Sequence, residues 1–126
     1  SMIHQKLELP GIERIRTRFL ELLRERQVSI AEHALTAWES DELEKINGSL
    51  ASARTLLHQI AGTAGSLGFE ELGQEARTVE TEIDDHLNGA DADLAICPGA
   101  LIYHMSDFVQ LCQTLTAAQP EPAQSA

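Results

Sequence analysis

One histidine in the sequence stands near two glycines at spacings that place all three on the same side of a helix. His58, Gly62 and Gly65 are separated by four and then three residues, which are the steps between neighbours on one helix face. A glycine inside a helix costs about 1 kcal/mol relative to alanine. We therefore expect this segment to present an imidazole beside a strip of backbone without side chains, and this strip to have a function.

Such an arrangement suits nucleophilic chemistry. A histidine ring nitrogen is a nucleophile near neutral pH, and the missing side chains at Gly62 and Gly65 leave room for a phosphoryl group and for a partner that closes over it. Small residues in a helix most often serve close helix packing, but packing does not explain the aligned histidine. A single histidine is most often an ordinary surface or core residue, and this interpretation is applied to His4, His33, His86 and His104.

The apolar residues before this segment repeat at the three- and four-residue spacing of an amphipathic helix. They predict one long helix from about residue 11 to about residue 40. Ser29 and Glu32 can form a capping box, so a break near Val28 remains an alternative. The residues expected to face the core are Ile12, Ile15, Phe19, Leu22, Leu23, Ile30, Ala34, Leu35 and Trp38.

The segment with His58 belongs to the second predicted helix. Asn47-Gly48 is typical of a helix stop, so Asn47 or Ser49 is expected to cap this helix, which should end at Gly68. Whether residues 41–47 are helical is left open. The residues expected to face the core are Leu50, Ala53, Leu57, Ile60, Ala61, Ala64 and Leu67.

Two further helices complete the pattern. The third carries its core face on Leu72, Ala76, Val79, Ile83 and Leu87. After a loop over residues 88–97, the fourth begins at Pro98 and ends near residue 117, with its core face on Leu101, Met105, Phe108, Cys112 and Leu115. The prediction is an all-α fold, an antiparallel four-helix bundle over residues 2–118. A short extra helix over Ile3–Leu9 and a disordered tail over residues 119–126 are also expected.

Composition supports helices and excludes several partners. Leucine and alanine far outnumber valine, and the formal net charge of −11 argues against binding to nucleic acid or to a membrane surface. Cys97 and Cys112 lack the spacing of a zinc site or a disulfide framework, so we expect reduced thiols in a cytoplasmic protein. No metal and no cofactor are expected, because the acidic pair Asp91 and Asp93 has no acidic residue at Ile102 to complete a calcium loop.

The sequence around His58 resembles the signature of histidine-containing phosphotransfer (HPt) domains. It runs His58-Gln59-Ile60-Ala61-Gly62-Thr63-Ala64-Gly65-Ser66-Leu67-Gly68-Phe69 and is followed by Leu72. The helix layout over about residues 12–117 agrees with that family. The resemblance implies a four-helix bundle in which His58 accepts a phosphoryl group from a receiver-domain aspartate and passes it to another. It implies that Gly62 and Gly65 provide clearance beside the ring.

One position departs from the family pattern. The family often carries a lysine three residues after the histidine, where it can neutralise the phosphoryl group, and this chain has Ala61 there. Arg54, one turn before His58 on the same face, is a candidate for that role. Glu80 falls where the family often places a polar residue that orients the imidazole, and a carboxylate there would hold the Nδ1 proton. For both side chains an ordinary solvated position is the alternative.

The leading hypothesis is a phosphocarrier of a two-component phosphorelay, without turnover of its own. Its expected partners are response-regulator receiver domains and a sensor histidine kinase. They are expected to dock around His58 on Thr55, Gln59, Ala61 and Ser66. A second hypothesis, favoured by Ala61, is a silent bundle of the same fold that docks on or inhibits a kinase or receiver. A third is a purely structural acidic bundle, such as a dimerisation element.

Overall fold

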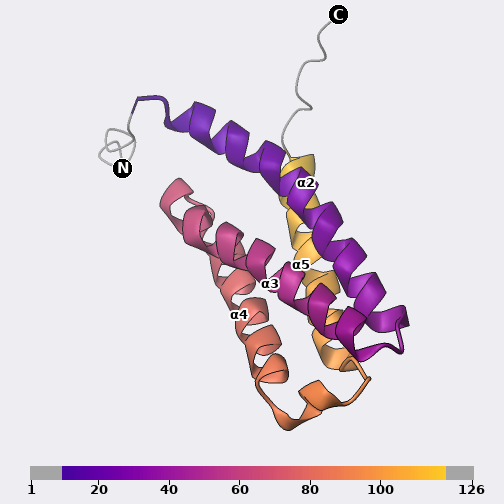
Figure 1. The fold of residues 1–126 in the computed structure, drawn as a ribbon. Helices are drawn as coiled ribbons and strands as arrows, with labels where there is room; N and C mark the ends of the chain where they lie inside the picture. The colour runs from indigo at the N-terminus through magenta and orange to yellow at the C-terminus, as the bar shows by residue number, and fades with distance from the viewer. Residues whose placement is uncertain (1–9, 119–126) are drawn as a thin grey trace, which may run out of the picture.

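The computed structural model describes residues 10–118 and contains four long helices packed as a bundle (Figure 1). They are α2 (Ile12–Glu39), α3 (Leu43–Ala64), α4 (Glu70–Leu87) and α5 (Gly99–Ala117). Short 3-10 turns follow α3 at Gly65–Leu67 and α4 at Ala90–Asp93. Residues 10–118 contain no strand, so the predicted all-α four-helix bundle is confirmed. The extra helix predicted over Ile3–Leu9 and the tail over 119–126 lie outside the described residues.

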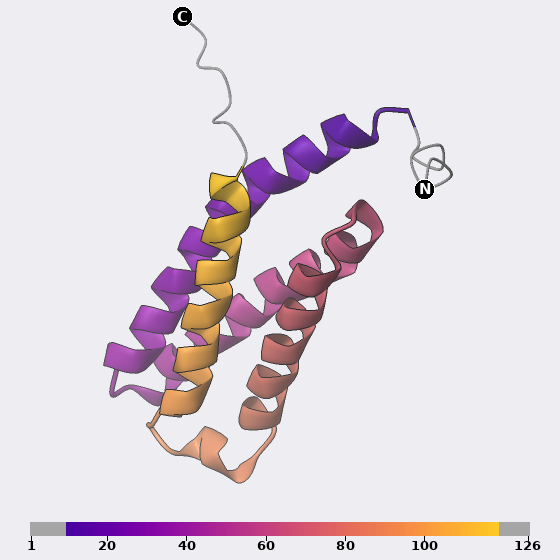
Figure 2. The ribbon, with the colours of Figure 1, turned by 180° about the vertical axis from the view of Figure 1, so that it is seen from behind.

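The helices form a closed ring in the order α2, α3, α4 and α5, since α2 packs on α3 and α5, and α4 packs on the same two helices. Figures 1 and 2 show that the α2–α3 turn and the α4–α5 loop lie at one end of the bundle. The α3–α4 turn lies at the other end, near the beginning of α2. The segment 58–65 therefore belongs to the end of the bundle where α2 begins and α4 starts.

Helix α2 is continuous through Val28, so the prediction of one long helix is confirmed and the alternative break is not found. The core face predicted for α2 includes residues that the structure leaves exposed. Ile15, Leu35 and Trp38 were expected inside but are exposed by 54, 55 and 58%. The reason is that α3 and α5 together cover only a narrow strip of α2. That strip comprises Phe19, Leu20, Leu23, Ile30, Ala34 and Ala37.

The stop predicted at Asn47-Gly48 is wrong. Helix α3 begins four residues earlier and runs through both positions, so neither Asn47 nor Ser49 caps it. Ile46 is fully buried, and burial of this side chain in the core outweighs the weak local preference for a turn. The Asn47 side chain instead donates a 2.9 Å hydrogen bond to the carbonyl of Ala92, which ties α3 to the turn that follows α4.

The end of this helical segment agrees with its sequence. Gly68 has φ = 90°, a left-handed conformation that favours glycine, and it terminates the 3-10 turn after α3 as predicted. The guanidinium of Arg16 donates a 2.9 Å hydrogen bond to the carbonyl of Leu67, which fixes the turn to α2. Pro98 precedes α5 directly at the expected position.

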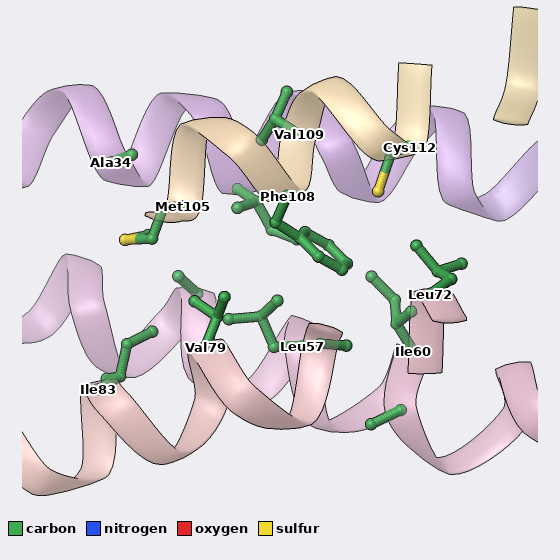
Figure 3. Packing of buried hydrophobic residues seen from close by; sticks show 14 of the residues in the cluster. Ala34, Leu57, Ile60, Leu72, Val79, Ile83, Met105, Phe108, Val109 and Cys112 are labelled. Atoms are coloured by element: carbon green, nitrogen blue, oxygen red, sulfur yellow. The ribbon is translucent and has the colours of Figure 1, made fainter. Parts of the chain in front are cut away.

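The core is a single cluster between the four helices (Figure 3). The core faces predicted for α3, α4 and α5 are buried, except that Leu87 and Leu115 are only partly covered. Cys97 and Cys112 are free and buried, as predicted. Burial raises the pKa of the Cys97 thiol to about 11 and that of the Cys112 thiol to about 12. The protonated thiol is therefore the dominant form of both residues near neutral pH.

Candidate functional site

His58 lies on the outer side of α3, with 72% of its side chain exposed. The neighbouring residues Leu57 and Ile60 are fully buried, and their burial fixes the rotation of the helix about its axis. Each residue of a helix is rotated by about 100° from the one before it. With Leu57 and Ile60 buried in the core, the His58 side chain therefore points into solvent. The imidazole is thus held on a rigid element and accessible to a partner.

The glycines beside this histidine are not required by packing. Gly62 and Gly65 are exposed, and a Cβ added at either would meet no heavy atom of the described chain within 4 Å. Gly73 of α4 differs, because a Cβ there would lie 3.4 Å from the Ala64 Cβ. Close packing between α3 and α4 therefore accounts for Gly73 only. Helix packing does not account for Gly62 and Gly65, which leave a bare strip of backbone next to His58.

Glu80 of α4 orients the imidazole. The distance from His58 Nδ1 to Glu80 Oε2 is 2.7 Å, and the Glu80 side chain is only 16% exposed. An ionised carboxylate only accepts hydrogen bonds, so Nδ1 carries the proton and donates it. The neutral ring then has its lone pair on Nε2. The pair thereby selects the tautomer in which Nε2 carries no proton.

Arg54 does not stand free beside the ring. Its guanidinium forms a 2.9 Å ion pair with Asp84 of α4, with about a third of each side chain exposed (36% and 41%). This pair lies one turn from the His58–Glu80 pair on both helices, because α3 and α4 run in opposite directions. Asp84 partly offsets the positive charge that the sequence suggested for a phosphoryl group on His58.

A second arginine lies about one turn from Glu80 on α4. Arg77 comes three residues before Glu80 in α4, and the antiparallel register set by the two ion pairs places it level with Ala61. It is exposed, and no ion pair is found for it within residues 10–118. Ala61 occupies the position of the usual lysine, and Arg77 is the basic residue of α4 at the same level, where it lines a recess together with Thr81 and Glu82. Sequence reasoning missed Arg77, since only the register of two helices reveals its position.

The residues expected to bind a partner divide into two groups. Thr55, Gln59 and Ser66 are exposed on the same side of α3 as His58. Ala61 is only 8% exposed and faces the core, so it offers almost no surface to a partner.

An apolar recess between α2 and α3 continues this exposed side. It has a volume of about 400 Å³, and its lining comprises Arg14, Ile15, Arg18, Phe19, Leu22, Arg26, Thr63 and Leu67. Ile15, which the sequence predicted in the core, is a wall of this recess. Three arginines therefore surround an apolar hollow in a chain whose net charge is −11.

A second histidine–glutamate pair lies between α4 and α5. His104 Nδ1 is 2.7 Å from Glu82 Oε2, the same distance as in the first pair. The hydrogen bond to Glu82 and its negative charge raise the pKa of His104, and the charges of Asp107 and Glu75 act in the same direction. No glycine adjoins His104 in the sequence. This pair is a satisfied surface contact, as the sequence analysis assumed, and it provides an internal comparison for His58.

The sequence matches the Hpt domain family over residues 14–121. No curated protein and no solved structure gives a significant match to the chain. None of the helices described here is long and apolar enough to cross a membrane. Within residues 10–118, no group of three or more His, Cys, Asp and Glu side chains is arranged to hold a metal ion.

Proposed function

Because the chain belongs to the Hpt domain family, we propose that it is a phosphocarrier that accepts a phosphoryl group on His58 from a receiver-domain aspartate and passes it to another receiver. Members of this family act as phosphotransfer intermediates together with receiver domains and kinases. The observation that carries the proposal is one exposed imidazole whose Nδ1 is held by Glu80 beside the bare backbone of Gly62 and Gly65.

The proposed transfer needs no proton to leave the ring. The lone pair of Nε2 forms a bond to phosphorus, the bond from phosphorus to the aspartate oxygen breaks, and the carboxylate leaves with the electron pair. The ring gains a positive charge while the Nδ1 proton remains hydrogen-bonded to Glu80. A partly buried carboxylate at this position stabilises that charge as it develops. Transfer to the next receiver is the reverse of this step.

The two arginines of this surface supply the charge that the usual lysine would supply. Arg77 and Arg54 lie about one turn on either side of His58 along the α3–α4 contact. Arg77 is the stronger candidate, because Asp84 partly neutralises Arg54. Both side chains are solvated, so each contributes roughly 0.2–1 kcal/mol. They assist the transfer but are not essential to it.

The recess between α2 and α3 supports docking of a receiver domain. A phosphorylated receiver carries negative charge at its phosphoaspartate, and the net charge of −11 on this chain would repel it. Arg14 and Arg26 at the recess offset that repulsion locally, and Arg18 does so less because it pairs with Glu21. Ile15 and Leu22 offer apolar surface to cover. We propose that a receiver covers His58, Gln59 and this recess together.

The proposal is tested by transfer from a phosphorylated receiver domain. We expect an acid-labile phosphate on the wild-type chain, loss of this label in His58→Gln, and full labelling in His104→Gln. His104→Gln is a matched control, because it removes the histidine of an equivalent ion pair. A label that survives in His58→Gln would contradict the proposal.

The alternative of a silent docking module rests on Ala61 in place of lysine. It predicts that a receiver or kinase binds the wild-type chain and His58→Ala equally well, and that no phosphohistidine forms on either. Binding measured by calorimetry, together with the labelling experiment, distinguishes the two functions.

A further inference from the structure

An exposed apolar surface runs along the outer side of α2 and α5. Val28, Leu35 and Trp38 of α2 are exposed by 56, 55 and 58%, and Ala31 completes their spacing of three, four and three residues. Ile102 of α5 borders this row, and the buried Val109 lies at the bottom of the recess between them. These six residues, called here the α2–α5 surface, have the spacing that suits packing against another helix.

The α2–α5 surface is hollowed as well as apolar. One recess of about 210 Å³ has walls that include Ala31, Leu35, Trp38, Ile102 and Val109. An adjoining recess of about 230 Å³ has walls of Gln27, Val28, Ala31, Glu32, Leu35, Val109 and Gln113. Such recesses accept side chains of a facing helix in the manner of knobs entering holes. None of the described helices covers them.

We propose that a second copy of this chain binds the α2–α5 surface, with the two α2 helices antiparallel about a two-fold axis level with residue 33. In this register Ala31 faces Leu35 of the second copy, and Val28 faces Trp38. Each small side chain thus meets a large one, as tight packing requires. The indole of Trp38 then lies over the recess beside Val28 of the other copy. A two-fold contact is self-complementary by construction.

The charge along α2 favours the antiparallel orientation. Within α2, residues 12–27 carry five arginines and three glutamates, whereas residues 28–39 carry two glutamates and no lysine or arginine. An antiparallel pair places the acidic end of one copy beside the basic half of the other. A parallel pair would place the two acidic ends together, where they repel each other.

The proposed dimer does not depend on phosphotransfer. His58 and Glu80 belong to α3 and α4, and no residue of the α2–α5 surface lies on these helices. Both copies of His58 therefore stay accessible in the dimer. If the chain does not dimerise, the proposed phosphotransfer function still stands. If His58 is not phosphorylated, the proposed dimer still stands.

Trp38 is the only tryptophan in the sequence, so its fluorescence reports on this surface alone. We expect the sedimentation mass to rise toward that of a dimer between about 1 μM and about 1 mM chain. Over the same range, the emission of Trp38 should shift to shorter wavelength and quenching by acrylamide should decrease. A monomer mass at every concentration, with unchanged emission, would overturn the proposal and point to a helix of another protein as the occupant.

Two substitutions test the location of the contact. Leu35→Glu should weaken dimerisation at least about 100-fold, because it places a charge in the apolar contact of both copies. Leu94→Glu is the matched control, since Leu94 is also about half exposed (50%) but lies in the loop before α5. Circular dichroism checks that both variants remain helical. Equal dimerisation of Leu35→Glu and wild type, or equal loss in both variants, would refute the assigned surface.

Discussion

The contact between His58 and Glu80 allows the sharpest prediction. Replacing Glu80 with alanine removes a 2.7 Å hydrogen bond from Nδ1 to a carboxylate that is 16% exposed. A hydrogen bond to a charged group contributes about 1.5–3 kcal/mol, and the 72% exposure of the ring favours the lower end of that range. The imidazole gains positive charge as the transition state forms, so loss of the Glu80 carboxylate appears in the rate. We expect transfer to slow by about 10-fold, which corresponds to about 1.4 kcal/mol.

The assay is single-turnover transfer from a phosphorylated receiver domain at saturating concentration. Saturation removes differences in docking, so the observed rate reports the chemical step. Glu80→Gln should fall between wild type and Glu80→Ala, because the amide oxygen still accepts from Nδ1 but carries no charge. The melting temperatures should differ little, because the His58 ring is 72% exposed and its contact with Glu80 reaches full strength only when the ring becomes charged during transfer.

Glu82→Ala serves as the control for this prediction. It breaks the equivalent pair with His104 on the other side of α4 and changes the net charge by the same amount. We expect its transfer rate to equal that of wild type. If Glu80→Ala transferred at the wild-type rate, or if Glu82→Ala slowed transfer equally, orientation of the ring by Glu80 would be refuted.

Three further predictions concern charge, clearance and pH. Arg77→Gln should slow transfer by about 1.5- to 5-fold at low salt, and added salt should reduce this difference. Gly62→Ala should stabilise the chain by up to about 1 kcal/mol in urea unfolding, because a Cβ has free space there, yet it should weaken receiver binding measured by calorimetry. The raised pKa of His104 means that its pair with Glu82 stabilises the fold fully below about pH 6.5, and that this contribution disappears as the pH rises through the folded-state pKa. Urea unfolding of wild type and Glu82→Gln should therefore differ at about pH 5.5 and converge at about pH 9.

Much of the fold follows from local pattern. The core positions of α3 and α4 repeat without interruption, so their burial was predictable from spacing. Two errors arose where tertiary contacts decide. Asn47-Gly48 reads as a stop, but burial of Ile46 carries the helix through it. Trp38 reads as core, but no other described helix covers that side of α2. Hydrophobicity alone does not distinguish a helix face that packs inside the bundle from an apolar face that stays exposed on its surface.

The candidate site was predictable where it lies within one helix. His58, Gly62 and Gly65 are linked by fixed spacing along α3, and the structure places them side by side. The positions of Arg77 and Asp84 relative to α3 depend on how α4 is registered against that helix, which the sequence of either helix does not contain. The same register shows that Arg54 is engaged by Asp84.

The proposed function requires that His58 carries the phosphoryl group on Nε2. After reaction with a phosphorylated receiver domain, ¹H–¹⁵N spectra of the ring nitrogens and the phosphorus coupling identify the modified atom directly. We predict one phosphohistidine, at His58, with phosphorus bonded to Nε2 and with the Nδ1 proton still donated to Glu80. A phosphoryl group on Nδ1 of His58, on another residue, or on none would contradict it.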